Sequence, residues 1–323
     1  MSFTFIIFGF TFKRLANNTY FLKMNIAILS RGPGLYSTQS LFHTGVRRGH
    51  HMRILDHMRC NIVIEKDIPQ IFYGNQVLTN IDAIIPRIGA SVTFYGAAIV
   101  RQFEMMNVFT VTSSDALLRS RDKLRCLQLL SSAGLGMPKT VFSDHSGNAE
   151  NLISAVGGCP VVIKLLSGTH GMGVVLAGTK QEAISMIDAF NSLKERVMVQ
   201  EFINEASGTD IRAFVVDGKV VAAMKRKARP GEFRSNLHRG ATAIAVKLTE
   251  AEEKAALAAA DILGLKVAGV DMLPANRGPL ILEVNPSPGL EGISKTTGVN
   301  VAASIIESIE KELGDRKRRK LVM

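Results

Sequence analysis

The sequence predicts an α/β (α+β) protein in which a parallel N-terminal unit precedes a larger body of antiparallel strands and helices. An apolar run at 25–30, a helical stretch and a second apolar run at 52–56 are typical of a βαβ unit, which requires a parallel sheet. Two later segments, 210–228 and 267–289, have the pattern of antiparallel hairpins, and the first contains an Asp-Gly turn. The 323 residues provide length for about two domains.

Residues 24–112 are predicted to form an N-terminal α/β domain. After the βαβ start we expect a strand with a turn at 81–89, a helix at 93–107 and a short strand within 108–114. This alternation of strands and helices continues the parallel arrangement.

Residues 113–311 are predicted to form a second domain, whose pattern changes near residue 140. Gly and Pro, which are helix-stop signals, close the helical stretches before that point. Beyond it we expect, in order, strands at 159–166 and 173–178, a helix at 180–193, a strand at 196–203, the hairpin 210–228, a helix at 249–265, the hairpin 267–289 and an amphipathic helix at 299–313.

Most of the positive charge lies at the two ends of the chain. The formal net charge is +11, but residues 1–23 contribute +3 and Arg316–Lys320 contribute +5. The body between them is therefore nearly balanced. We interpret the basic segment 312–323 as a solvated tail rather than a nucleic-acid-binding arm.

Residues 1–23 do not read as a targeting segment. Their basic residues follow the apolar run, which is the reverse of a signal peptide, and the run is too short to cross a membrane. We expect the folded protein to start at Met24, with residues 1–23 poorly ordered or not native. A membrane-surface anchor is the alternative.

The three cysteines have no CxxC spacing. This argues against a disulfide framework and against a structural zinc site. The pattern fits a cytoplasmic protein with reduced thiols.

The apolar stretch LILEVNPSPG (280–289) carries Glu283 and Asn285 on one face, because alternate residues of a strand point the same way. A buried carboxylate requires a basic partner or a metal. Asp271 lies on the preceding strand and should face Glu283 if the turn is centred near 276–278. Two carboxylates and an amide are the hard oxygen ligands that Mg²⁺ or Mn²⁺ prefers. An ordinary polar or salt-bridged strand is the alternative.

A metal site of this kind usually serves a nucleotide, so phosphate contacts are expected. Lys164 interrupts the apolar strand 159–166, and its charge needs an anionic partner unless the strand is an edge and the lysine reaches solvent. The segment SGTHGMG (167–173) lies between two strands, so it is neither a Walker loop nor a dinucleotide fingerprint. A Gly-rich hairpin can still cover phosphates with its N–H groups, although glycines are common in any hairpin turn.

Two further features could contact a nucleotide. Glu201 ends an apolar strand and is followed by Phe202, which suits an adenine-binding position. The loop EFRSNLHRGATA (232–243) gathers arginine, asparagine and histidine before a glycine. Arginine is well shaped for bidentate contact with phosphate, and a solvated surface loop is the alternative.

The order of these features resembles the ATP-grasp fold, and several motifs resemble the RimK-type alpha-L-glutamate ligases. That family adds glutamate to the C-terminus of ribosomal small-subunit protein six. The resemblance covers about residues 24–311 and rests on MNIAILSRG, IPRIGASVTFYG, RQFEM, RDKLR, EFRSNLHRG, ANRGPL and EVNPSPGLEGI. Pro286 stands where the family motif often has alanine, which leaves Glu283 and Asn285 intact.

The resemblance implies which residues hold ATP and metal. The phosphates would contact Lys123 and Lys164, the adenine Glu201 and Phe202, and the ribose Asp210, with Arg234, Ser235 and Asn236 completing the nucleotide site. Two ions, Mg²⁺ or Mn²⁺, would be held, the first by Asp271 and Glu283 and the second by Glu283 and Asn285.

The implied reaction is ATP-dependent peptide-bond formation. A carboxylate of the acceptor attacks the γ-phosphate to give an acyl phosphate, and the amine of L-glutamate then displaces phosphate. Arg226 is interpreted as stabilising the tetrahedral intermediate or holding a substrate carboxylate. Because acyl phosphates hydrolyse, we expect a Gly-rich lid at about 140–203 above a metal-binding subdomain at about 204–311. The resemblance also implies a homotetramer.

Three alternatives stay open. The same chemistry could act on a small molecule, a peptide or a carrier protein. A nucleotide-regulated protein that binds RNA or the ribosome through its basic tail is a second class, disfavoured because a pure binder needs no converging metal ligands. A membrane-attached enzyme would rest on residues 1–23 alone. The leading hypothesis involves neither a nucleic-acid substrate nor a membrane.

Overall fold

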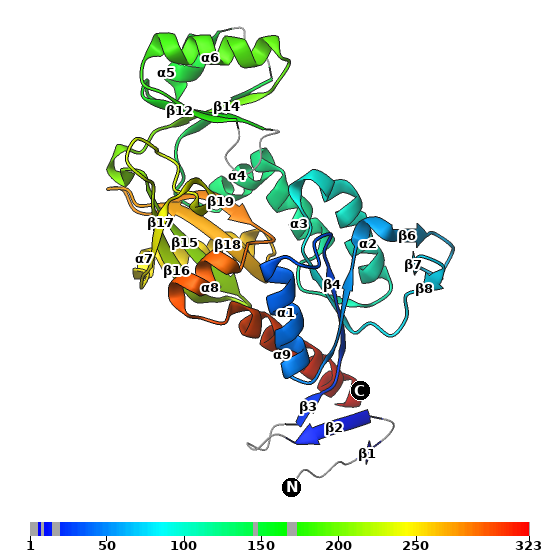
Figure 1. Ribbon diagram of the computed structural model, residues 1–323. Helices are drawn as coiled ribbons and strands as arrows, with labels where there is room; N and C mark the ends of the chain where they lie inside the picture. Colours follow the sequence, from blue (N-terminus) through cyan, green and yellow to red (C-terminus); the bar gives the residue numbers. More distant parts are fainter. Residues whose placement is uncertain (1–5, 8–9, 15–19, 145–147, 167–172, 323) are drawn as a thin grey trace.

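The computed structural model describes residues 6–7, 10–14, 20–144, 148–166 and 173–322. In Figure 1 the N-terminal unit lies beside a large antiparallel sheet, and a smaller sheet carrying two helices lies above that sheet. This arrangement confirms the predicted α/β (α+β) class with a parallel N-terminal sheet.

The N-terminal unit is built on a four-stranded parallel sheet with the order β10-β9-β4-β5. Its strands are β4 (Asn25–Leu29), β5 (His51–Leu55), β9 (Ala83–Pro86) and β10 (Phe109–Thr110), and its helices are α1 (Tyr36–Arg47) and α2 (Thr93–Met105). Strand β4 leads through α1 to β5 on one side, whereas β9 leads through α2 to β10 on the other. The chain therefore reverses its winding direction between β4 and β9.

Two short antiparallel sheets were not predicted. One is a meander of β6 (Cys60–Val63), β7 (Gln70–Tyr73) and β8 (Gln76–Val77), whose strands are too short for a periodic signal. The other joins β1 (Ile6–Ile7), β2 (Phe10–Arg14) and β3 (Tyr20–Leu22). Part of the segment that we predicted to be poorly ordered or not native thus forms strands. Phenylalanine, isoleucine and threonine, which favour strands, dominate this segment.

The small sheet has the order β11-β14-β12-β13 and is antiparallel. Its strands are β11 (Thr140–Ser143), β12 (Val161–Leu165), β13 (Val174–Ala177) and β14 (Val197–Glu201), and its helices are α5 (Ala149–Ala155) and α6 (Lys180–Ser192). One face packs Val161, Ile163 and Val199 against the helices. Because strand residues alternate, the opposite face carries Lys164 and Gln200.

The large sheet has the order β17-β16-β15-β18-β19 and is also antiparallel. Its strands are β15 (Thr209–Val216), β16 (Lys219–Lys227), β17 (Thr242–Ala245), β18 (Val267–Leu273) and β19 (Leu280–Asn285). Asp217 and Gly218 both have positive φ, at 47° and 72°, as a tight hairpin turn requires. Both predicted hairpins are confirmed.

Helices cover one face of the large sheet. Residues such as Ala213, Val270 and Ile281 pack with Ala256 of α7 (Glu250–Ile262) and Leu130 of α4 (Lys123–Ser132). The remaining helix of this region, α3 (Ser114–Arg121), connects the N-terminal unit to α4. Short 3₁₀ turns lie at His57–Arg59, Ala90–Val92, Asn204–Ala206 and Leu237–Arg239.

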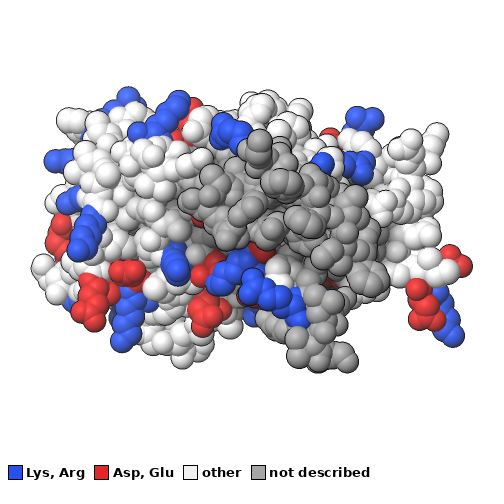
Figure 2. All heavy atoms as spheres, turned by 90° about the horizontal axis from the view of Figure 1, so that it is seen from below, with Lys and Arg blue, Asp and Glu red and all other residues white. Residues whose placement is uncertain are grey.

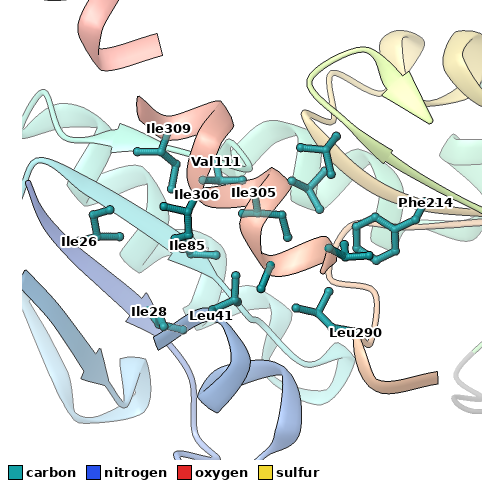
Figure 3. Close-up of a cluster of buried hydrophobic side chains, with 14 of the residues drawn as sticks. Ile26, Ile28, Leu41, Ile85, Val111, Phe214, Leu290, Ile305, Ile306 and Ile309 are labelled. Carbon is teal, nitrogen blue, oxygen red and sulfur yellow. The ribbon is translucent and has the colours of Figure 1, made fainter. Parts of the chain in front are cut away.

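The other face of the large sheet joins the N-terminal unit. Phe214 of β15 shares a core with Ile26, Ile85 and Ile306, the last of which lies on α9 (Val301–Val322). Figure 3 shows α9 between the parallel strands and Phe214, with Leu290 beside it. Leu290 precedes the short helix α8 (Glu291–Thr297). This shared core fixes the parallel sheet against the strands that carry the site.

Helix α9 is longer than predicted. The pattern placed its end near residue 313 and treated 312–323 as a tail, but the helix continues to Val322. Arginine and lysine are good helix formers, and Glu312 pairs with Arg316 one turn later at 3.1 Å. The basic segment thus continues α9 as far as Val322.

On the face shown in Figure 2, Lys and Arg side chains are interspersed with Asp and Glu. Within the described ranges, no helix is both long enough and apolar enough to cross a membrane.

Candidate active site

Charged side chains occupy one end of the large sheet, on the face opposite α7. Along β15, Phe214 lies in the apolar core of that face, while Arg212 and Asp210 continue it at the next alternate positions. Arg226 is the cross-strand partner of Asp210, and Asp271 is the partner of Arg212. The same face is therefore apolar where the N-terminal unit covers it and ionic beyond.

The predicted metal ligands lie on adjacent strands. Asp271 pairs in register with Glu283, as the hairpin spacing predicted, and Asn285 pairs with Gly269 two positions along. Asp271 is buried, Glu283 is exposed and Asn285 is partly buried. The Asn285 Oδ1 accepts a hydrogen bond from the backbone N–H of Ser287 at 2.9 Å, which holds the amide at the start of the following turn.

These oxygens suit a hard divalent ion. Two carboxylates and an amide from one sheet face are the ligand types of Mg²⁺ or Mn²⁺. In the described part of the chain, no group of three or more His, Cys, Asp or Glu is placed to hold a metal ion. The residues present fit the group that the resemblance implies.

Asp271 also belongs to an ion-pair network. Arg212 donates to it through Nε and Nη2, each at 2.6 Å, and Arg226 Nη2 lies 3.0 Å from its Oδ2. Burial alone would raise the pKa of Asp271, but the two guanidinium groups hold it below its ordinary value. A carboxylate offers about four lone-pair positions, so the three arginine contacts leave about one position for a metal.

Arg226 is buried, and its first contacts are with acids of the sheet. Its Nε and Nη2 donate to Asp210 at 2.7 and 2.5 Å. Burial and the neighbouring Asp271 carboxylate raise the pKa of Asp210, while Arg226 and a hydrogen bond from Ser235 oppose the rise. Arg212 was missed from the sequence, although a charge in the apolar strand DIRAFVV is the same signal that singled out Lys164.

Two lysines face this charged end from other elements. Lys164 lies on β12, an internal strand, so the edge-strand interpretation is wrong. Its Nζ donates to Gln200 Oε1 at 2.7 Å, and Lys123 Nζ donates to the Leu166 carbonyl at 2.7 Å.

Burial lowers the pKa of Lys164 to about 8; the Glu283 carboxylate opposes this shift, and the charge of Lys123 adds to it. Burial also lowers the pKa of Lys123, again opposed by Glu283. Both lysines therefore lie within electrostatic reach of Glu283.

The expected adenine residues lie where the small sheet meets the large one. Glu201 accepts a hydrogen bond from the Lys139 backbone N–H at 2.6 Å and forms an ion pair with Arg277. The ring of Phe202 contacts that of Phe233 edge to face, with centroids 6.4 Å apart. These contacts make an aromatic corner next to a fixed carboxylate.

The loop that carries Arg234, Ser235 and Asn236 bridges both sheets. Arg234 donates to the Val174 carbonyl of β13 at 3.1 Å and pairs with Glu232 at 2.8 Å. Hydrogen bonding from Arg234 lowers the pKa of Glu232 to about 2. Ser235 is buried beside Asp210, and Asn236 is partly buried just before a 3₁₀ turn.

Of the predicted Gly-rich segment 167–173, residues 167–172 lie outside the described residues. The strands on either side of it, β12 and β13, pair directly, with Lys164 opposite Val174. The segment therefore connects two neighbouring strands of the small sheet.

The chain matches known protein families along most of its length. The RimK-like ATP-grasp domain model matches residues 120–309, and the RimK PreATP-grasp domain model matches residues 24–117. A probable alpha-L-glutamate ligase of Aliivibrio fischeri (strain MJ11) is 56% identical over 296 residues, spanning 92% of this chain and 98% of the relative. One of Pseudomonas fluorescens (strain SBW25) is 57% identical over 296 residues, with the same two coverages.

Solved structures share the fold at low sequence identity. The ATP-grasp ligase PsnB, complexed with a phosphomimetic variant of its minimal precursor, Mg and ADP, has a TM-score of 0.70 at 19% identity, covering 89% of this chain and 97% of PsnB. D-alanine–D-alanine ligase from Bacillus anthracis complexed with ATP has a TM-score of 0.64 at 20% identity, covering 92% and 99%. The motif resemblance is confirmed by both family models and by the relatives' identity: the chain belongs to the RimK family of ATP-grasp ligases.

Proposed function

We propose that this protein is an ATP-dependent ligase that adds L-glutamate to the C-terminal carboxylate of a ribosomal small-subunit protein. The observation that carries the proposal is the pairing of Asp271 with Glu283 across β18 and β19, with Lys123 and Lys164 within electrostatic reach of Glu283. Acidic and basic groups that face each other in this way suit a metal–nucleotide complex. The curated relatives are named probable alpha-L-glutamate ligases.

In this proposal the lysines contact the phosphates of ATP. Burial lowers the pKa of Lys164 to about 8, and an anionic phosphate would oppose this shift and hold the lysine in its charged form. Phe202 and Glu201 receive the adenine, and Asp210 receives the ribose. Arg234, Ser235 and Asn236 complete the nucleotide site from the loop that already touches β13.

Asp271, Glu283 and Asn285 would hold two ions of Mg²⁺, or of Mn²⁺ in its place. When bound, the ions would supply positive charge that offsets the negative charge of the nucleotide phosphates. Arg212 and Arg226 fix the orientation of Asp271, and Arg226 fixes Asp210 as well. These contacts favour a positioning role for Arg226 over direct contact with the tetrahedral intermediate.

The proposed reaction has two steps. An oxygen of the acceptor carboxylate attacks the γ-phosphorus, the bond from that phosphorus to the bridging oxygen of ADP breaks, and an acyl phosphate forms. The glutamate nitrogen then attacks the acyl carbon and loses a proton, and inorganic phosphate leaves with the electrons of the broken carbon–oxygen bond. Lys123 and Lys164 neutralise charge on the transferred phosphoryl group.

The test is intact-mass measurement of the ribosomal protein after incubation with enzyme, ATP, Mg²⁺ and glutamate. We expect a ladder of glutamyl increments with the natural protein and with Glu253→Gln, a matched exposed glutamate on α7. We expect no ladder with Glu283→Gln. ADP release without a ladder would indicate that the same reaction acts on a small-molecule, peptide or carrier-protein acceptor. Absence of ADP release with every acceptor would contradict the proposal that the protein is a ligase.

We propose that the enzyme works in the cytoplasm as a homotetramer. Cys60, Cys126 and Cys159 are free thiols, which fits a reducing compartment. Light scattering on the purified chain tests the tetramer, and a monomeric mass at working concentration would refute it.

A further inference from the structure

Two arginines of the N-terminal half lie beside the candidate site without an acidic partner. Arg87 directly follows β9, and its Nη2 donates to the Pro288 carbonyl at 2.7 Å. Arg121 ends α3, and its Nη2 donates to the Ile88 carbonyl at 2.7 Å. Among the residues that the structure describes, neither guanidinium has a carboxylate oxygen within 4.0 Å. Arg121 Nε is buried with no hydrogen-bond partner in the same part of the chain.

The pair is electrostatically unfavourable without an anion. Burial lowers the pKa of Arg87 to about 10, and the charge of Arg121 adds to the effect. Burial also lowers the pKa of Arg121, with Glu283 opposing. Two like charges partly removed from water are costly unless a negative group accompanies them. Hydrogen bonds to backbone carbonyls alone could be made by neutral side chains, so they do not explain two guanidinium groups.

The position of the pair in the fold is a ligand-binding position. Strands β4 and β9 are neighbours, and the chain reverses its winding direction between them. In open α/β sheets, ligands bind outside the carboxyl ends of the strands at such a switch point. Arg87 directly follows the carboxyl end of β9, and Arg31 lies two residues after the carboxyl end of β4.

Neighbouring groups add positive potential at the edge of the parallel sheet where β4 and β9 have their carboxyl ends. Helices α1 and α2 both begin after these strands, and neither has an acidic residue in its first turn or a side-chain cap. Helix N-termini carry partial positive charge. The edge also contacts the active site, because Arg87 holds the turn that follows Asn285.

We infer that Arg87 and Arg121 form a binding subsite for a carboxylate of the glutamate that acts as nucleophile, and this inference rests on the proposed function. Glutamate reacts through its amine and keeps its carboxylates charged throughout the reaction, so it needs permanent cationic partners. The acceptor carboxylate, in contrast, is consumed as an acyl phosphate at the phosphate and metal side. Guanidinium groups suit this role because they stay charged and can bind carboxylate in a bidentate manner.

The experiment measures ADP release by Arg121→Gln and Arg87→Lys, with Arg101→Gln on the exposed surface of α2 as control. We expect the KM for glutamate to rise about 10-fold or more in both variants, because a charged hydrogen bond to substrate is lost or misplaced. The KM values for ATP and acceptor should stay within about 2-fold, since those groups bind elsewhere. Arg101→Gln should match the natural protein.

Substrate choice gives a second readout that a structural role would not move. The natural protein should prefer glutamate to glutamine, and Arg121→Gln should reduce that preference if the subsite holds the side-chain carboxylate. If the preference is retained while the KM for glutamate rises, the subsite holds the α-carboxylate, and the inference stands.

Other outcomes overturn the inference. A raised KM for the acceptor alone would assign the arginines to the acceptor carboxylate. Unchanged KM values with a lowered melting temperature would show that the two arginines only stabilise the fold.

If the natural protein releases no ADP with any acceptor, the proposed function fails separately. Calorimetric titration of glutamate in the presence of Mg²⁺ and a non-hydrolysable ATP analogue then decides the subsite. Binding that Arg121→Gln abolishes would support it, and no binding to the natural protein would refute it.

Discussion

The guanidinium of Arg212 pairs side-on with the carboxylate of Asp271 across β15 and β18, with both nitrogen–oxygen distances at 2.6 Å. Arg226 approaches the same carboxylate at 3.0 Å. Asp271 is thus both an expected metal ligand and the acid that neutralises two arginines. Glu283, its cross-strand partner, is exposed and forms no ion pair with another residue that the structure describes. Substitutions at these two positions should therefore separate folding from metal binding.

Replacing Asp271 with asparagine should cost both stability and activity. The change leaves Arg212 and Arg226 facing an amide, and breaking a buried pair costs about 3 kcal/mol of unfolding free energy. Denaturant titration at pH 7 measures this loss, and Asp261→Asn, an exposed change on α7, should leave stability unchanged. The arginines hold the pKa of Asp271 in the folded state below its ordinary 3.8. The ionised carboxylate therefore stabilises the fold at pH values above 3.8, and this contribution is lost as the pH falls through the folded-state pKa. An equal difference from the natural protein at pH 7 and at pH 2 would contradict this assignment.

Replacing Glu283 with glutamine should abolish ATP turnover and leave the fold almost unchanged. The side chain is exposed, so we expect unfolding free energy to change by less than about 1 kcal/mol. Turnover at saturating Mg²⁺ is the measurement, with Glu253→Gln as the matched control. Full turnover in Glu283→Gln would remove this residue from the metal site.

Replacing Lys164 with methionine should stabilise the protein at neutral pH and weaken ATP binding. The folded pKa is about 8 against an ordinary 10.5, so between these values the unfolded state holds a proton that the folded state has lost. Stability therefore rises with pH across this window, and below it the charge destabilises the fold. Lys164→Met removes that cost, and after loss of the Gln200 hydrogen bond we expect a net gain of about 1–2 kcal/mol at pH 7.

The gain in unfolding free energy from Lys164→Met should disappear above about pH 10.5, where lysine is neutral in both the folded and the unfolded state. ATP affinity should fall at least about 10-fold at pH 7, because a charged contact to phosphate is removed. Lys180→Met, an exposed change on α6, should alter neither quantity. A destabilised Lys164→Met at pH 7 would show that Lys164 is a structural residue.

Local patterns in the sequence predicted the part of the site that lies on one hairpin. Asp271 and Glu283 could be paired because strand alternation and a short turn define register without knowledge of the rest of the fold. Lys164 was recognisable because a charge interrupts an apolar strand. Both inferences use neighbours along the chain.

The rest of the site depends on contacts between distant segments. Arg212 reaches Asp271 across 59 residues, and Arg87 reaches Pro288 across 201. Which strands lie side by side, and how the parallel sheet docks on the turn after Asn285, cannot be read from periodicity. Arg226 is a different case, because Asp210 lies opposite it on the same predicted hairpin, and the register of that hairpin was not used to pair them.

Replacing Gly269 with alanine should test how the turn after Asn285 is held. A Cβ at Gly269 would lie 2.7 Å from Cβ of Pro288, so the turn must shift, and overpacking of this kind costs about 1–3 kcal/mol. Because Asn285 begins that turn and the Pro288 carbonyl binds Arg87, we expect the Mg²⁺ requirement and the KM for glutamate to rise together.

The matched control for Gly269→Ala is Gly314→Ala, on α9. A Cβ there meets nothing within 4 Å, so the change should stabilise the helix by about 0.5–1 kcal/mol without affecting activity. If Gly269→Ala raises only the Mg²⁺ requirement, the turn positions Asn285 but not the arginine subsite. If Gly269→Ala raises neither the Mg²⁺ requirement nor the KM for glutamate, the turn after Asn285 can move without disturbing the site. Packing at β18 would then have no effect on the arginine subsite.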